Sequence, residues 1–163
     1  MRHPTMTHRF ATAGYTSDVG AWREHNEDAV RVNTARGLLV VADGMGGHAA
    51  GEVASRLTVD TVEGAVAGEG VGLAEALARA HDNVRNAARD GRGAPGMGTT
   101  CVAALIDDDG VQVAWVGDSR AYCYRDGDLL PLTLDHSYVQ SLVNAGLLAA
   151  EHADSHPDRH ILA

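Results

Sequence analysis

Two acidic glycine loops, each placed at the end of an apolar strand pattern, constrain this chain more than any other feature. Residues 40–48 read Val-Val-Ala-Asp-Gly-Met-Gly-Gly-His, and residues 116–120 read Val-Gly-Asp-Ser-Arg. Asp43 and Asp118 therefore follow segments that we expect to be buried strands. A carboxylate in such a place costs several kcal/mol to desolvate unless a cation or hydrogen-bond donors receive it. With the acidic run at residues 20–28, the loops predict a divalent-metal site that handles phosphate.

Length and composition indicate one folded domain with an acidic surface. The chain has 163 residues, and 45% hydrophobic content is enough to build a core. Its formal net charge is -9, from 22 acidic against 13 basic residues, and no block of Lys or Arg occurs. This balance argues against nucleic acid as a partner.

Two further features bear on location. The first residues lack the apolar core of a signal peptide, and no uncharged stretch approaches the ~20 residues that span a bilayer. The two cysteines, Cys101 and Cys123, are too few for a secreted disulfide scaffold and each lies in an expected strand, so we expect them to pack as small hydrophobes. We expect a cytoplasmic protein that does not associate with membranes.

The order of the expected elements favours an α+β fold. Strands come first, two amphipathic helices follow, and a run of strands with hairpin signals at residues 107–110 and 125–128 predicts an antiparallel meander. Ser137 is expected to cap a last short helix. The expected strands are 10–16, 29–33, 38–42, 99–106, 111–116, 121–125 and 128–133, and the expected helices are 48–66, 73–88 and 137–144.

A dinucleotide-binding alternative arises because residues 44–49 fit the pattern G-x-G-x-x-A between a strand and a helix. That fold needs a second parallel strand soon after the helix, ending in an acid for the ribose. Here the acids about 20 residues on, Asp60 and Glu63, lie inside a helical pattern. The context therefore weighs against this alternative.

A zinc site is a second alternative, because three histidines recur at four-residue steps: His152, His156 and His160. Pro157 interrupts any helix that would align them, and no cysteine lies nearby, so solvated histidines are favoured.

A serine hydrolase is a third alternative, raised by Ser119 and by the neighbours His136 and Ser137. Adjacent residues rarely face each other as nucleophile and base, which makes this assignment unfavourable.

The assembled motifs resemble those of the metal-dependent protein phosphatases of the PPM family, also called PP2C, and especially its bacterial members that oppose Ser/Thr kinases. The resemblance lies in several ordered motifs and covers nearly the whole chain. The matching segments are Gly-x-x-Arg-x-x-Asn-Glu-Asp at 20–28, Val-Ala-Asp-Gly-Met-Gly-Gly-His at 41–48, Gly-Thr-Thr at 98–100, Gly-Asp-Ser-Arg at 117–120, Asp-His-Ser at 135–137 and His-Pro at 156–157.

This resemblance implies a PP2C-like sandwich of two antiparallel β-sheets flanked by helices, with metals in a cleft at one end. It implies that Asp43 bridges two Mn²⁺ or Mg²⁺ ions and that the Gly44 carbonyl binds one of them. Hard oxygen ligands suit these ions, and a paired site makes a bridging hydroxide available at neutral pH.

The resemblance assigns roles to four other residues. Arg23 would grip the substrate phosphate, which a guanidinium fork matches. Glu27 and Asp28 would hold metal-bound waters or orient the arginine. Asp118 would bind a third metal, as in bacterial relatives.

Two departures from the family pattern matter. Met45 stands where many eukaryotic members have a histidine considered to be a general acid, and His48 lies too far along to take that role. The chain also ends at residue 163, before the family's Ser-Asp-Gly and Asp-Asn segments, whose aspartates complete the metal site. The sheets would lose their last strands, which leaves open edges and exposed apolar faces.

The sequence therefore predicts that residues 1–163 form a PPM-type phosphatase domain lacking the family's C-terminal part. The predicted function is metal-dependent hydrolysis of phosphoserine and phosphothreonine in phosphorylated proteins that a Ser/Thr kinase produces, through a metal-bridging water. The alternative is an inactive remnant that binds phosphoproteins. Self-association through the open sheet edges is a further expectation.

Overall fold

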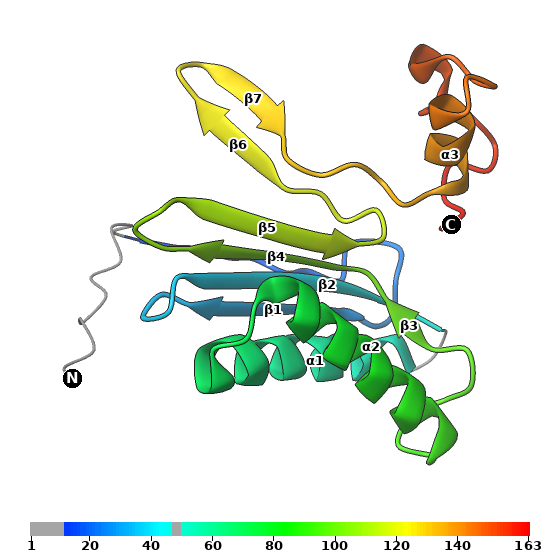
Figure 1. Cartoon of the computed structure of the whole chain (residues 1–163). Helices are drawn as coiled ribbons and strands as arrows, with labels where there is room; N and C mark the ends of the chain where they lie inside the picture. Colours follow the sequence, from blue (N-terminus) through cyan, green and yellow to red (C-terminus); the bar gives the residue numbers. More distant parts are fainter. Residues whose placement is uncertain (1–11, 47–49) are drawn as a thin grey trace.

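The computed structural model describes residues 12–46 and 50–163, and its elements follow the order expected from the sequence (Figure 1). The strands are β1 (Asp28–Asn33), β2 (Leu38–Met45), β3 (Gly98–Thr99), β4 (Cys101–Ile106), β5 (Val111–Val116), β6 (Tyr122–Arg125) and β7 (Asp128–Pro131). The helices are α1 (Ala50–Glu63), α2 (Leu73–Arg89) and α3 (Tyr138–Asn144), with a π-helical turn at Gly64–Glu69 and a 3-10 turn at Ala150–His152.

The strands form two antiparallel sheets. The larger is five-stranded, with the order β1-β2-β4-β5 and with β3 paired to the end of β2; the smaller is the β6–β7 hairpin. Every strand pair in the described part of the chain is antiparallel. The predicted α+β fold of two antiparallel sheets flanked by helices is confirmed. The strand expected at 10–16 is wrong for its described residues 12–16, which form no strand.

Alternation along β2 explains which face of the large sheet is covered. Leu38, Val40 and Ala42 are fully buried, whereas Val41 keeps 42% of its surface exposed. Helices α1 and α2 lie against the buried face (Figure 1), where Val59 of α1 joins the three strand residues in one core cluster. A period of two in a strand and an apolar stripe on each helix are sufficient to produce this layer.

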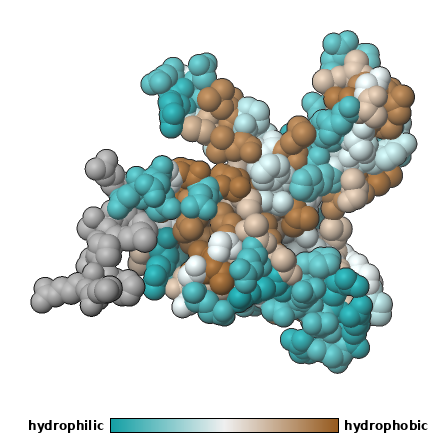
Figure 2. All heavy atoms as spheres, in the orientation of Figure 1, coloured by the Kyte–Doolittle hydropathy of each residue, from teal (hydrophilic) through white to brown (hydrophobic). Residues whose placement is uncertain are grey.

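The opposite face of the large sheet is open. The register places Val41 beside Val102 of β4, and Val102 beside Trp115 of β5, so one apolar row crosses three strands. Figure 2 shows apolar residues in view over the middle of the sheet, and Figure 1 shows the β6–β7 hairpin rising beyond β5. Leu129 and Leu130 of that hairpin are 62% and 51% exposed. The face that a second full sheet would cover is therefore accessible.

The helix ends follow local chemistry. The α1 pattern continues past the predicted end at residue 66 as the π-helical turn, and stops where Gly70 takes the left-handed φ of 74°. The Ser137 side chain caps α3 by accepting a hydrogen bond from the Gln140 amide at 3.1 Å, as predicted. In the described residues, no helix has the length and apolar character needed to cross a membrane.

The end of β2 and the first turn of α1 approach each other backbone to backbone. A Cβ on Gly44 would lie 2.1 Å from the Gly51 carbonyl oxygen, and a Cβ on Gly51 would lie 2.8 Å from the Gly44 carbonyl carbon and 2.7 Å from Glu27 Cδ. Only glycine fits on either side. This contact sets the position of the strand end that carries Asp43.

Gly51→Ala tests this contact. We expect a loss of about 1–3 kcal/mol in the free energy of unfolding, because the new methyl group overpacks a backbone contact. The matched control is Gly64→Ala, where nothing lies within 4 Å of a built Cβ. There we expect a gain of up to about 1 kcal/mol, from helix propensity. Urea denaturation of both variants measures the difference, and equal stability in the two would contradict the close approach.

Candidate functional site: an acidic cluster at the end of the sheet

Asp43 lies at the end of β2 on the open face of the large sheet. Its backbone is held by β3 and by Thr100, which lies between β3 and β4: the Asp43 amide donates to Thr100 Oγ1 at 3.2 Å, and the Thr100 amide donates to the Asp43 carbonyl at 2.9 Å. The Thr99 hydroxyl donates to the same carbonyl at 2.9 Å. These bonds leave the Asp43 carboxylate available for a ligand.

Asp28 is the cross-strand neighbour of Asp43. The two residues are directly opposite in the β1–β2 register, so their side chains project from the same face. Like charges opposite each other in a sheet are destabilising unless something neutralises them. This pairing could not be predicted from the sequence, because it depends on the register of two strands.

The pKa of Asp43 is raised above its ordinary value of 3.8. Although the residue keeps an exposed surface, partial burial of its carboxyl group is the largest cause. The charges of Asp28 and Asp118 follow, together with a side-chain hydrogen bond to Asp28, whereas the charge of Arg23 acts in the opposite direction. Carboxyl groups from two other segments, Asp28 of β1 and Asp118 of the loop after β5, therefore both act on Asp43 at this end of the sheet.

Arg23 and Glu27 lie beside this cluster in the loop before β1. Arg23 Nη1 is 3.8 Å from Glu27 Oε2, and the Arg23 side chain is 76% exposed against 13% for Glu27. The Glu27 carbonyl accepts hydrogen bonds from the Gly44 amide at 3.2 Å and from Ser55 Oγ at 2.6 Å. Glu27 is thus anchored to β2 and α1, while the guanidinium of Arg23 extends into solvent.

Asp118 lies in the loop after β5 and is half-buried. Its neighbour Ser119 is joined to the β2 end through Thr100, because Thr100 Oγ1 lies 2.6 Å from Ser119 Oγ. One threonine hydroxyl therefore connects the Asp43 strand with the Asp118 loop. Sequence reasoning placed Thr100 in a motif but assigned it no role, since only the fold shows that this hydroxyl contacts both acidic loops.

The donor set at this site suits a hard divalent cation. Carboxylate and carbonyl oxygens are the ligands that Mg²⁺ and Mn²⁺ prefer, and a cation would offset the partial burial and the carboxylate repulsion that together raise the Asp43 pKa. Within residues 12–46 and 50–163, however, no three His, Cys, Asp or Glu side chains are grouped closely enough to hold a metal ion.

The alternatives from the sequence find little support. β2 is antiparallel to both neighbours, so the parallel strand that a dinucleotide fold requires does not follow α1. The described residues contain no zinc-like cluster, His152, His156 and His160 included. His48 lies outside the described residues.

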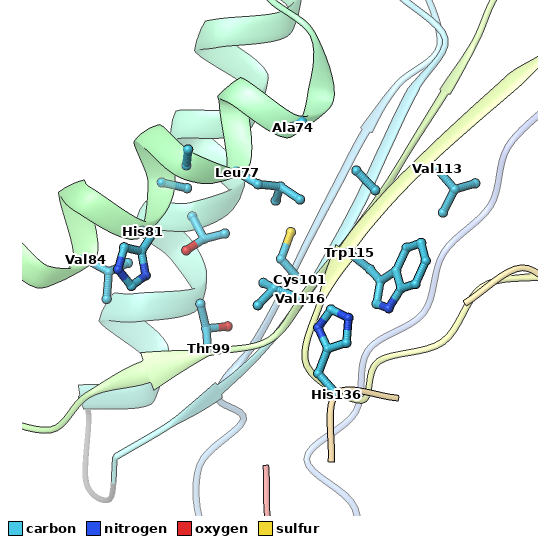
Figure 3. A pocket seen from close by; sticks show the side chains of 14 residues that line it. Ala74, Leu77, His81, Val84, Thr99, Cys101, Val113, Trp115, Val116 and His136 are labelled. Carbon is cyan, nitrogen blue, oxygen red and sulfur yellow. The ribbon is translucent and has the colours of Figure 1, made fainter. Parts of the chain in front are cut away.

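An apolar cavity of about 600 Å³ lies between α2 and β5 (Figure 3). Its walls include Leu77 and Val84 of α2 and Val116 of β5, and none of the acidic site residues lines it. The rings of Trp115 and His136 lie at its margin. This cavity is therefore separate from the acidic cluster.

Known proteins with similar sequences and structures point to one family. The sequence model of the family described as Protein phosphatase 2C matches residues 22–155. The serine/threonine protein phosphatase PstP of Mycobacterium tuberculosis is 38% identical over 167 residues, which covers 99% of this chain and 32% of that protein.

Two solved structures show the same likeness. Serine/threonine phosphatase Stp1 from Staphylococcus aureus has a TM-score of 0.83 and 36% identity, covering 99% of this chain and 68% of the other. The catalytic domain of PstP in complex with two manganese ions has a TM-score of 0.74 and 38% identity, covering 85% and 61%. This chain spans about a third of the full M. tuberculosis protein and under two thirds of that catalytic domain.

Asp43→Asn tests the electrostatics of the site in metal-free protein. A raised pKa means that the folded state disfavours the ionised form, so folding is penalised once pH exceeds the ordinary value of 3.8. We expect the variant to melt at a higher temperature than the parent at pH 7 in EDTA. The gain should shrink as pH falls towards that value.

Asp128→Asn on the exposed hairpin is the matched control and should leave the melting temperature unchanged. A lower melting temperature for Asp43→Asn at pH 7 would instead show that Arg23 outweighs the neighbouring carboxylates.

Proposed function

The chain belongs to the protein phosphatase 2C family, and from that premise we propose that residues 1–163 are the larger part of a metal-dependent phosphatase domain that hydrolyses phosphoserine and phosphothreonine. The relatives named above are serine/threonine phosphatases, and this chain spans less than two thirds of the PstP catalytic domain. The observation that carries the proposal is geometric: Asp28 lies directly opposite Asp43 at the end of the sheet, beside an exposed arginine. Partial burial and the charges of Asp28 and Asp118 raise the Asp43 pKa there.

We assign metal ligation to the acidic cluster. Asp43 and the Gly44 carbonyl would bind the cations, Glu27 and Asp28 would hold them through water or orient Arg23, and Asp118 would take a further ion. The structure of PstP with two manganese ions supports Mn²⁺ or Mg²⁺ as the metal. When bound, such cations act as Lewis acids on a phosphate group and lower the pKa of water.

The protein's own groups would position the substrate. The exposed guanidinium of Arg23 offers paired N–H donors that match two phosphate oxygens. Arg23 Nη1 lies 3.8 Å from the carboxylate of Glu27, and the Glu27 backbone is hydrogen-bonded to β2 and α1. The attraction of this anchored carboxylate would help to orient the guanidinium. The open face around Asp43 leaves room for a peptide carrying the phosphate.

One observation favours the second candidate, a module that binds phosphoproteins without hydrolysing them. No group of three metal-ligating side chains is assembled in the described parts of the chain. A cation with few protein oxygen ligands is held weakly, and hydrolysis depends on that cation. Phosphate recognition by Arg23 does not depend on it and would be retained.

The partners in this proposal are phosphorylated proteins made by a Ser/Thr kinase, and the proposed location is the cytoplasm. Self-association is also part of the proposal. Strands β1 and β5 end the large sheet on either side, and Val41, Leu129 and Leu130 are exposed. Unpaired edges and apolar patches promote contacts between copies.

A phosphothreonine peptide distinguishes the two functions. We expect peptide binding by fluorescence anisotropy, slow Mn²⁺-dependent phosphate release by the 163-residue chain, and loss of that release in Asp43→Asn. Binding without release would favour the phosphoprotein-binding module. Neither binding nor release, or equal release in the parent and Asp43→Asn, would overturn the proposed site.

Arg23→Ala tests substrate recognition separately. We expect the peptide dissociation constant to rise about 10- to 100-fold, the range for losing a charged hydrogen-bond pair. Because the side chain is 76% exposed, the free energy of unfolding should change by less than about 1 kcal/mol. Arg125→Ala at the exposed hairpin is the matched control. A large loss of stability in Arg23→Ala would make this residue structural instead.

Analytical ultracentrifugation tests self-association. We expect the sedimentation coefficient of the isolated chain to rise with protein concentration. Replacing Leu129 and Leu130 by serine should reduce that rise, because both side chains are exposed and neither belongs to a buried core cluster. A monodisperse monomer at all concentrations would contradict the expectation.

A further inference from the structure

His136 makes two hydrogen bonds to a single glycine in the Asp118 loop. The His136 amide donates to the Gly117 carbonyl at 2.9 Å, and the Gly117 amide donates to His136 Nδ1 at 3.3 Å. Gly117 is buried and has a φ of 95°, with Thr100 Cγ2 only 2.7 Å from where a Cβ would be. Both backbone groups of this constrained residue are therefore satisfied by one histidine.

The imidazole is itself held in place. It stacks on the Trp115 ring with a centroid distance of 5.7 Å and an interplanar angle of 23° (Figure 3). Trp115 Nε1 donates to the Leu134 carbonyl at 2.8 Å, which ties the chain just before His136 to β5. Because Nδ1 accepts a hydrogen bond, the ring carries its proton on Nε2 in this arrangement.

Asp135, the residue before His136, holds the other end of the Asp118 loop. Arg120 forms a two-pronged ion pair with Asp135, with Nε to Oδ1 at 2.8 Å and Nη2 to Oδ2 at 2.6 Å. Asp135 and His136 therefore hold the loop on both sides of Asp118. The segment that connects β7 to α3 thus acts as a brace for a loop that precedes it by fifteen or more residues.

We propose that His136 is a positioning residue for the metal site: through Gly117 it directs the Asp118 carboxylate towards Asp43. The inference rests on the proposed function insofar as Asp118 binds a cation. His136 acts on the loop backbone and contacts neither substrate nor metal. His136 Nδ1 performs this role by accepting the hydrogen bond from the Gly117 amide, and the stacking on Trp115 orients the imidazole so that Nδ1 faces that amide.

Two variants separate the acceptor from the ring. His136→Asn keeps an acceptor oxygen near the position of Nδ1 and loses the stacking, whereas His136→Phe keeps an aromatic ring and loses the acceptor. In metal-free protein, we expect hydrogen exchange of the Gly117 amide to accelerate about tenfold or more in His136→Phe, because a buried N–H loses its partner. His136→Asn should restore most of that protection.

The amide of Val40 in the core of β2 reports global opening and is the internal reference. If exchange at Val40 and Gly117 accelerated equally in His136→Phe, the effect would be general destabilisation and the positioning role would be overturned. Selective acceleration at Gly117 supports it.

A Mg²⁺ titration followed by amide chemical shifts tests the link to the metal site. In His136→Phe, we expect the midpoint at Ser119 to rise about tenfold, equivalent to one lost hydrogen bond, while the midpoint at Gly44 stays within about threefold. His136→Asn should lie close to the parent. An unchanged Ser119 midpoint in His136→Phe would overturn the inference while leaving the Asp43 site intact.

If the parent protein showed no Mg²⁺-dependent shift at either Ser119 or Gly44, the proposed metal site would fail and the directing role with it. That result is distinguishable from failure of the inference alone, which requires the parent to respond and His136→Phe to respond identically.

Discussion

The contact between the backbones of Gly44 and Gly51 is the constraint on which the acidic site depends. It brings the end of β2 against the first turn of α1 with no side chain between them. Glu27 lies against the same contact, because its carbonyl accepts from the Gly44 amide and from Ser55 Oγ. The carboxylate of Asp43 therefore stands on a rigid junction of strand, helix and loop, which is the kind of support a binding site needs.

The order and type of most elements could be predicted from the sequence, because period-two and helical patterns report which side chains are buried. The capping role of Ser137 could also be predicted, from local chemistry alone. The π-helical turn and the absence of a strand at 12–16 could not be predicted, since local residue patterns do not report the tertiary packing that decides both.

Some features of the candidate site could likewise be predicted from the sequence and others could not. The chemistry of Asp43 and Asp118 could be inferred from carboxylates placed after apolar strands. The connection between their loops through Thr100 could not be predicted, because a threonine in a strand pattern usually reports only β propensity. The Thr100 hydroxyl is hydrogen-bonded to Ser119 Oγ and accepts a hydrogen bond from the Asp43 amide, so the two acidic loops share one support. The pairing of Asp28 with Asp43 likewise depends on strand register, which local sequence does not reveal.

The open sheet face and the acidic cluster are two consequences of one arrangement. The odd-numbered residues of β2 alternate away from the helices, so Val41 and Asp43 project from the same uncovered face. The strand thus presents apolar surface along its length and charge at its end, where β1 and the loop after β5 bring Asp28 and Asp118 within electrostatic reach. A layer placed over the apolar rows would also reduce the water around the carboxylates, and a lower local dielectric strengthens both their repulsion and their attraction for a cation. Covering this face and binding a cation beside Asp43 would therefore be coupled, because a cation offsets the charge that a covering layer makes more costly to bury.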